Sequence, residues 1–91
     1  MNLNTKIIRN SDIISSKVDE ELVMFDAQAN IYYNLNEIAS VIWNKLEDTL
    51  SVEKLCKDLT EIFDVSEKVC QKEVMVILEK MNKKRLVSIV E

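Results

Sequence analysis

Residues 26–46, DAQANIYYNLNEIASVIWNKL, contain the point at which the chain changes from strand to helix, and they decide the fold. The segment Ile31-Tyr-Tyr-Asn-Leu35 favours a β-strand, and residues 26–30 have the right length for a hairpin connection before it. Asn30 is the residue best suited to a positive φ in that connection, because the chain has no glycine. Asn36 then favours a helix N-cap, and the apolar positions after it recur with the 3.6-residue period of an amphipathic helix. The pattern predicts strands up to about Leu35 and helices after Asn36.

The sequence before this segment also predicts strands. Between Thr5 and Lys17, two isoleucine pairs flank an Asn-Ser-Asp turn, which indicates a short strand, a turn and a second extended segment. Residues 21–26 form another apolar run bounded by charged side chains. Asp26 is expected to tighten the hairpin that follows this run.

The sequence after the segment predicts two more helices and a short last strand. Ser51 and Ser66 are expected to cap the second and third helices, and the third runs to about Lys84. The apolar tail 86–90 favours a strand. We therefore expect an α+β fold of winged helix-turn-helix-like order in a single domain, residues 1–91. It should have an N-terminal three-stranded antiparallel β-meander followed by three α-helices.

Residue types on which most enzymes depend are missing from the chain. It contains no histidine, the commonest general base and metal ligand, and no glycine, which phosphate-binding loops and dinucleotide fingerprints require. Its net charge of −4 also argues against a protein that grips a phosphate backbone. We expect no catalytic residue, no metal, no cofactor and no nucleic-acid partner.

The sequence carries no signal for export or for a membrane. Its apolar runs are far shorter than the roughly 20 residues that a membrane helix needs, and the N-terminus lacks the apolar core of a signal peptide. Cys56 and Cys70, the only cysteines, both fall on apolar helical faces. A disulfide between them is one alternative, but we expect buried, reduced thiols in a cytoplasmic protein.

The third helix has more apolar surface than one core-facing stripe requires. Cys70, Val74, Ile77, Leu78 and Met81 form that stripe, whereas Val69 and Val76 lie to one side of it. These two valines either pack under the sheet or remain available to a partner. Residues 66–91 carry a net charge of +2, against −6 for residues 1–65. The lysines of this helix are either a solvated face or a surface for an acidic partner.

One segment resembles a known family, through Asp26, Asn30-Ile-Tyr-Tyr-Asn-Leu-Asn36 and Ala39-Ser-Val-Ile-Trp43. It is similar to the pattern D…G-x-Y-Y-x-L-N…A-x-x-I-W of the PqqD-like family, whose members are often called RiPP recognition elements. The resemblance continues in the family's order through Val52-Glu-Lys-Leu55, Phe63-Asp-Val65 and Glu73-Val74 to Leu86-Val87. The family usually has glycine where this chain has Glu20, Asn30 and Arg85. Asn30 is a suitable replacement, but Glu20 and Arg85 predict a differently built first hairpin turn and a third helix that runs on further.

The resemblance implies a non-catalytic domain that binds the leader segment of a ribosomally made precursor peptide. It implies a second partner as well, a modifying enzyme of the same pathway such as a leader peptidase, a cyclase or a radical-SAM enzyme. Lasso-peptide, radical-SAM and quinone-cofactor pathways all remain open, with the small standalone form favouring the lasso branch. The predicted secondary structure is compatible with peptide binding, because a three-stranded meander leaves its last strand with a free edge to which a peptide can add.

We expect the peptide to add beside residues 31–35 in a groove whose far wall is the third helix. The predicted peptide-binding residues come from these two elements: Ile31, Tyr32, Tyr33, Asn34, Leu35, Val69, Lys72, Glu73, Val76 and Lys80. Strand alternation places Tyr32 and Tyr33 on opposite faces, and Tyr33 is the expected core residue.

The main alternative function is a winged-helix DNA-binding regulator that uses the third helix for recognition. Its basic end favours that interpretation, whereas the net charge and the glutamates along the helix oppose it. A structural subunit of a larger complex is a further alternative.

Overall fold

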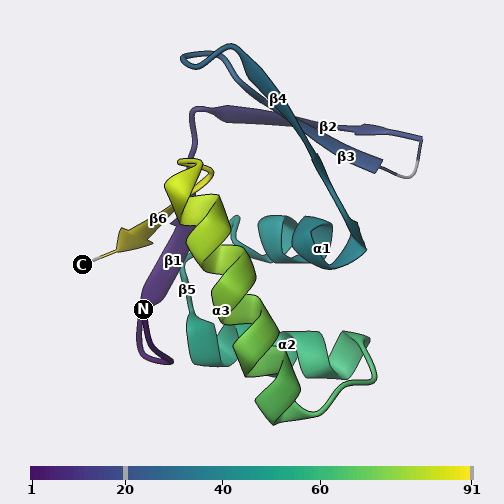
Figure 1. The fold of residues 1–91 in the computed structure, drawn as a ribbon, viewed down its shortest axis with the longest axis vertical. Coiled ribbons are helices and arrows are strands. Elements are labelled where there is room, and N and C mark those ends of the chain that lie inside the picture. The colour runs from purple at the N-terminus through teal and green to yellow at the C-terminus, as the bar shows by residue number, and fades with distance from the viewer. Residues whose placement is uncertain (20, 91) are drawn as a thin grey trace.

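Two antiparallel sheets flank a group of three helices in this α+β fold (Figure 1). The computed structural model describes residues 1–19 and 21–90. The larger sheet contains β2 (Ile13–Val18), β3 (Glu21–Asp26) and β4 (Ile31–Leu35) in the order β2-β3-β4. Met24 lies opposite Tyr33 in the β3–β4 register. The expected three-stranded meander is therefore confirmed.

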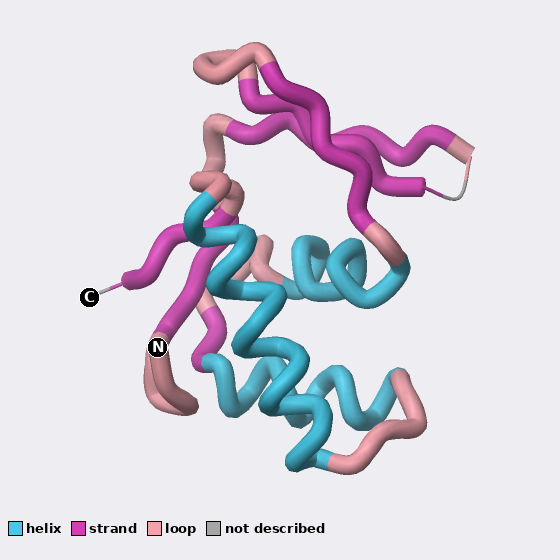
Figure 2. Tube along the Cα trace, in the orientation of Figure 1, coloured by secondary structure: helices cyan, strands magenta, loops and turns pink. Residues whose placement is uncertain are grey.

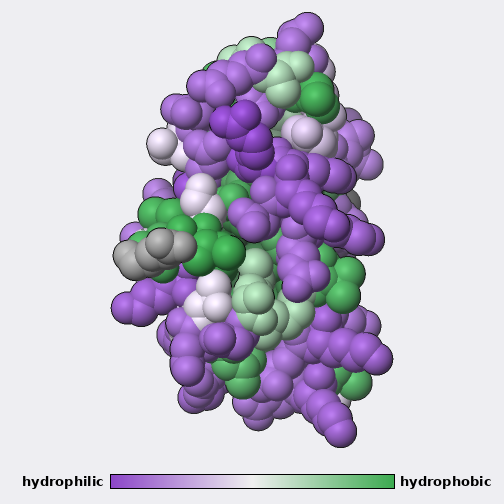
Figure 3. All heavy atoms as spheres, turned by 60° about the vertical axis from the view of Figure 1, so that its left-hand side comes forward, coloured by the Kyte–Doolittle hydropathy of each residue, from purple (hydrophilic) through white to green (hydrophobic). Residues whose placement is uncertain are grey.

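The smaller sheet joins both ends of the chain. It contains β1 (Lys6–Arg9), β5 (Leu50–Ser51) and β6 (Val87–Val90) in the order β5-β1-β6. The sequence predicted β1 and β6 as extended segments but not their pairing, in which Lys6 lies opposite Val90. Ile89 and Val90 of β6 are exposed, and apolar side chains gather there in the view of Figure 3.

Three helices follow the meander in the predicted order: α1 (Glu37–Lys45), α2 (Val52–Ile62) and α3 (Glu67–Lys83) (Figure 2). Each begins after its predicted cap. The Asn36 side chain accepts the Ala39 amide at 2.9 Å, the Ser51 hydroxyl accepts the Lys54 amide at 3.1 Å, and the Ser66 hydroxyl accepts the Val69 amide at 3.3 Å. The winged helix-turn-helix description applies loosely, because the larger sheet precedes the helices in the chain.

The core lies where the two sheets and the helices meet, since it includes Ile7 of β1 and Val87 of β6. Trp43 of α1 is buried, as expected, and Met24 of β3 packs into the same apolar cluster. On α3 the predicted stripe faces this core: Cys70, Val74, Leu78 and Met81 are buried and Ile77 is half-buried. Both cysteines are buried free thiols, so the alternative of a disulfide is wrong.

Positive φ occurs at two positions where the PqqD-like family, which the sequence resembles, usually has glycine. Asn30 has a φ of 56°, as predicted. Arg85 has a φ of 63°, and the amides of Arg85 and Leu86 donate to the carbonyls of Asn82 and Met81 at 3.1 and 2.9 Å. These are the two bonds of a Schellman motif, which satisfies the last carbonyls of a helix. The prediction that α3 runs on further is therefore wrong, because this bonding outweighs the unfavourable φ of a side-chain-bearing residue.

The corresponding expectation for Glu20 lies outside the described residues. In the part of the chain that the structure describes, no helix has the length and apolar character needed to span a membrane.

Candidate functional site

Strand β4 lies at the edge of the larger sheet. Among the described strands it pairs with β3 alone, so its other edge is free. In an antiparallel pair, alternate residues turn their N–H and C=O groups toward the partner, which leaves those of the residues between them at the free edge. A strand of five residues therefore offers about two or three such residues to an added strand.

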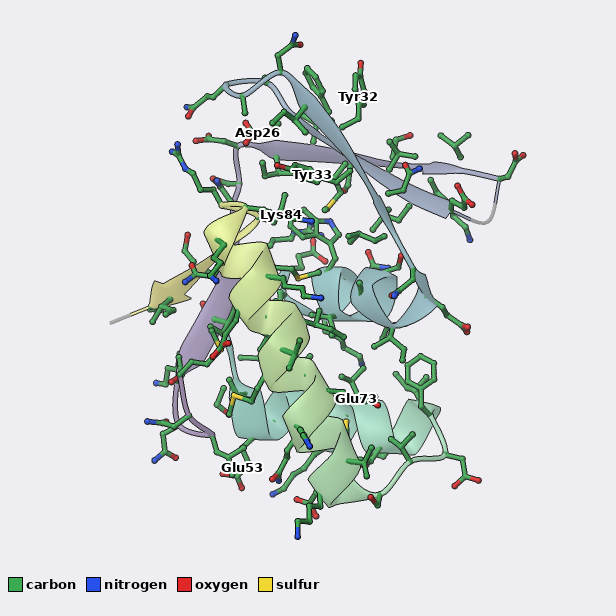
Figure 4. The ribbon with its side chains drawn as sticks, viewed as in Figure 1. Asp26, Tyr32, Tyr33, Glu53, Glu73 and Lys84 are labelled. Atoms are coloured by element: carbon green, nitrogen blue, oxygen red, sulfur yellow. The ribbon has the colours of Figure 1, made fainter. Side chains whose placement is uncertain are left out.

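The side chains of β4 alternate as its period predicts. Tyr33 is half-buried and packs against the core, whereas Tyr32 is 71% exposed. The Tyr32 ring lies over Phe25 on the outer face of the sheet, with 4.6 Å between ring centroids. In Figure 4, Tyr33 points toward the end of α3 and Tyr32 points away from the helices. The expectation that Tyr33 is the core-facing tyrosine is confirmed.

A groove of about 220 Å³ separates β4 from the C-terminal half of α3. Four consecutive residues of the chain, 33–36, line it. Because successive side chains of a strand point to opposite faces, a lining that includes every residue indicates a groove that opens along the strand's edge. Its other lining residues come from α1, α3 and the segment after α3: Ala39, Ile77, Lys80, Met81, Lys84 and Leu86.

Two cations define one end of this groove. Lys80 of α3 and Lys84, the residue that caps the C-terminus of this helix, lie one turn apart, and the Lys84 ammonium is 5.4 Å from the centroid of the Tyr33 ring. That geometry is a cation–π contact, which favours positions of the exposed ammonium near the groove. Neither lysine forms an ion pair with a carboxylate of residues 1–19 or 21–90, where the ion pairs involve Lys54 and Lys57. An anionic ligand group would therefore meet two free positive charges.

A small apolar hollow lies farther toward the N-terminus of α3. It has a volume of about 20 Å³. Its lining comes from all three helices and the segment between α2 and α3: Ile38, Leu59, Phe63, Val65, Cys70, Glu73 and Val74. Glu73 is the only charged side chain among these residues and is exposed. The hollow therefore suits an aliphatic group.

A larger cleft of about 530 Å³ lies between the β2–β3 hairpin and α1. Leu22 and Leu35, which are opposite each other in the β3–β4 register, both line it. Two side chains on the same sheet face place this cleft beneath the sheet rather than along its edge. From β4 the cleft is lined by Leu35 alone, and the groove between β4 and α3 is therefore the better candidate site for a peptide beside this strand.

The structure brings some of the predicted site residues together and leaves others apart. Tyr33, Asn34, Leu35 and Lys80 line the groove, and Glu73 borders the hollow. Ile31 and Tyr32 are exposed on β4. Val69 and Val76 are 47% and 49% exposed, so the alternative that they pack under the sheet is wrong. With Lys72, these valines lie on α3 outside the linings of the groove and the hollow.

The sequence reasoning missed several groove residues. Ile77 and Met81 were assigned to the core, and they line the groove from the margin of that stripe. Lys84 was noted as one of the basic residues at the end of α3, but its position over Tyr33 depends on where the helix ends. The useful signal was the i, i+4 spacing of Lys80 and Lys84 on one helix face.

The two thiols lack the surroundings of reactive cysteines. The Cys70 thiol donates to the Cys56 carbonyl, with a sulfur–oxygen distance of 3.8 Å. Burial is the main cause that raises the pKa of Cys56 to about 11, and it also raises the pKa of Cys70. At neutral pH both are therefore protonated, and the thiolate is the nucleophilic form. No group of three or more His, Cys, Asp or Glu side chains that could hold a metal ion occurs in residues 1–19 and 21–90.

Comparisons with known proteins point to one family and one fold. Residues 21–87 match the family described as Coenzyme PQQ synthesis protein D (PqqD). The fold is similar to that of TbiB1 in complex with the TbiA(beta) leader peptide, with a TM-score of 0.81 and 21% identity over 89% of this chain and 94% of that one. It is also similar to lasso peptide synthetase B1 complexed with the leader peptide, with a TM-score of 0.79 and 18% identity over 90% of this chain and 96% of that one. No curated protein matches the sequence.

Proposed function

The chain belongs to the PqqD family, and from this premise we propose that it binds the leader segment of a ribosomally made precursor peptide without catalysing a reaction itself. The observation that carries the proposal is the free edge of β4 beside a groove walled by α3. Two solved structures of similar fold each hold a leader peptide, which supports a peptide as the ligand. The protonated thiols and the absence of histidine support a binding role rather than a catalytic one.

The leader adds as a fourth antiparallel strand beside residues 31–35. Backbone bonding alone leaves little net affinity, because about three to five hydrogen bonds at ~0.5–1.5 kcal/mol each contribute roughly 1.5–7.5 kcal/mol in total. Ordering a flexible peptide costs roughly 2–5 kcal/mol or more. Side-chain contacts must provide the remainder, and the groove supplies an apolar wall through Ile77, Met81 and Leu86.

Contacts farther along α3 extend this site in the proposal. An aliphatic leader side chain packed against Val69 and Val76 would contribute about 1.5–3 kcal/mol if it were fully buried. Both valines are about half exposed, so they remain available to a ligand. Lys72 and Glu73 would form the polar margin of the same surface.

The second partner in the proposal is a peptide-modifying enzyme of the same pathway, to which this domain presents the bound precursor. The fold shared with lasso peptide synthetase B1 supports the lasso branch. A leader peptidase and a cyclase would then be the enzymes served.

An N-methyl scan of the leader tests strand addition without changing the protein. Candidate leaders are taken from the short reading frames next to this gene, and each variant of the leader that binds carries one N-methylated amide. Alternate amides of an added strand face β4, so affinity measured by calorimetry should fall at every second position. A scrambled leader and a random DNA duplex are the controls and should not bind.

Amide chemical shifts in the protein locate the same contact. On addition of leader they should change along residues 31–35 and along α3. If the affinity in the N-methyl scan does not fall at every second position, the result contradicts strand addition. If the chemical-shift changes are confined to α1 and α2, they contradict binding in this groove. Failure of the leader to bind contradicts the proposed function as a whole.

A further inference from the structure

The groove and the hollow, which lie at different heights along α3, differ in chemical character. Lys80 and Lys84 lie at the end near the C-terminus of α3, whereas the hollow beside Val74 is apolar and has an acid, Glu73, at its margin. From Val74, α3 rises about 9 Å to Lys80 and about 15 Å to Lys84, at ~1.5 Å per residue. A peptide lying along α3 therefore meets an apolar site at one end and a cationic site at the other.

The direction of the peptide follows from the directions of β4 and α3. Tyr33 of β4 contacts Lys84 at the end of α3, while Ile38, which follows β4 in the chain, lies beside Val74. Strand β4 and helix α3 therefore run in opposite directions, as Figure 1 shows. A strand added antiparallel to β4 runs parallel to α3. Its N-terminal part lies near Val74 and its C-terminal part near Lys84.

We propose that the groove and the hollow together select a peptide in which an aliphatic residue precedes an acidic residue by about three to five positions. The inference rests on the proposed function, because it names the peptide that the same site would take. The spacing comes from the 9–15 Å rise of α3 divided by the ~3.3 Å that an extended chain covers per residue. The aliphatic tip enters the hollow lined by Ile38, Phe63 and Val74. The carboxylate lies between Lys80 and Lys84.

The charges around the groove support a carboxylate at that end. Neither lysine is paired with a carboxylate in the described part of the chain, and the groove lining contains no acidic side chain. The Tyr33 ring restrains the Lys84 ammonium, so less side-chain freedom is lost when an anion binds. A basic ligand residue there would meet two like charges, which opposes the wrong peptide as well as favouring the right one.

The test is selection from a random dodecapeptide library displayed on phage, carried out with three proteins. These are the wild type, the double variant Lys80→Glu with Lys84→Glu, and the control Lys6→Glu with Lys68→Glu. The control makes the same change in net charge with exposed lysines that line neither the groove nor the hollow. Soluble copies of the enriched peptides are then titrated against all three proteins.

The wild type and the control should enrich Val, Ile or Leu followed three to five positions later by Asp or Glu. The groove variant should enrich Lys or Arg at the second position instead. It should bind the wild-type peptides about tenfold or more weakly, as expected when two attractive contacts become repulsive.

Three outcomes would overturn the inference. Enriched peptides without an acid, or an acidic preference that survives the charge reversal, would refute the role of the two lysines and leave leader binding intact. An acid that consistently precedes the aliphatic residue would refute the direction of the strand. If the wild type enriched no peptide, the proposed peptide-binding function would fail, and this inference with it.

Discussion

Replacing Arg85 with glycine should stabilise the protein without altering the groove. Arg85 has a φ of 63°, where a side chain costs about 1–2 kcal/mol that glycine does not incur. Glycine in turn gives up about 0.5–1 kcal/mol through the greater freedom of the unfolded chain. The bonds at this position use only the backbone of residue 85, because its amide donates to Asn82 and its carbonyl accepts from the Asn10 side chain at 2.9 Å. They survive the change, so the net gain should be about 0.75 kcal/mol at the middle of these ranges.

Thermal denaturation followed by circular dichroism measures this gain. For a domain of this size, ~1 kcal/mol corresponds to a rise in Tm of about 4–8 °C. Glu79→Gly is the matched control: this exposed residue lies inside α3 and outside the groove lining, and its replacement should lose about 1 kcal/mol. Asn30→Gly should gain less, because asparagine already tolerates positive φ. An unchanged or lower Tm for Arg85→Gly would refute the assignment of a strained C-terminal turn.

Four further outcomes are expected. Cys56→Ala combined with Cys70→Ala should lower the free energy of unfolding by roughly 1–3 kcal/mol, because packing is lost in the core. Leader binding, measured by calorimetry, should be retained. A well-folded double variant that does not bind the leader would contradict a purely structural role of the two cysteines. Burial raises the pKa of the Cys56 thiol to about 11 in the folded protein, against ~8.5 in the unfolded chain. The protonated thiol therefore contributes stability that is complete below pH ~8.5 and is lost as the pH rises toward 11. The urea midpoint of unfolding should fall more between pH 8 and pH 10.5 in the wild type than in Cys56→Ala. Val76→Asp should change stability by no more than about 0.5 kcal/mol, since the side chain is about half exposed, while abolishing leader binding; unfolding on circular dichroism would show that the residue belongs to the core. Asp26→Ala should lower the free energy of unfolding by about 1–2 kcal/mol, because the Asp26 carboxylate accepts hydrogen bonds from the amides of Gln28 and Ala29 at 3.1 and 3.2 Å. An unchanged Tm would show that this carboxylate does not stabilise the hairpin.

Much of the fold could be predicted because the responsible interactions are local. The side chains of the caps Asn36, Ser51 and Ser66 each accept a hydrogen bond from the amide three residues later. The start of each of these helices is therefore determined by a few neighbouring residues. The inward position of Tyr33 follows from the two-residue period of a strand. The positive φ of Asn30 follows from the demands of a short turn on a chain without glycine.

The smaller sheet and the end of α3 depend on contacts that local patterns do not contain. Strand β1 pairs with β6, which lies at the opposite end of the chain, and only the packed helices bring the two together. Arg85 was expected to let α3 continue because positive φ disfavours a side chain. The bonds of Arg85 and Leu86 to the last turn of the helix stop it nevertheless.

The sequence by itself determined the edge strand, the helix carrying spare apolar and basic residues, and the likeness to a peptide-binding family. Only the tertiary structure decided which part of α3 faces β4. A helix presents its residues all around its axis, and its rotation and height beside a sheet are set by how its buried side chains fit the core. Here the burial of Cys70, Val74, Leu78 and Met81 turns Ile77, Lys80 and Lys84 toward the groove and leaves Val69 and Val76 beside it.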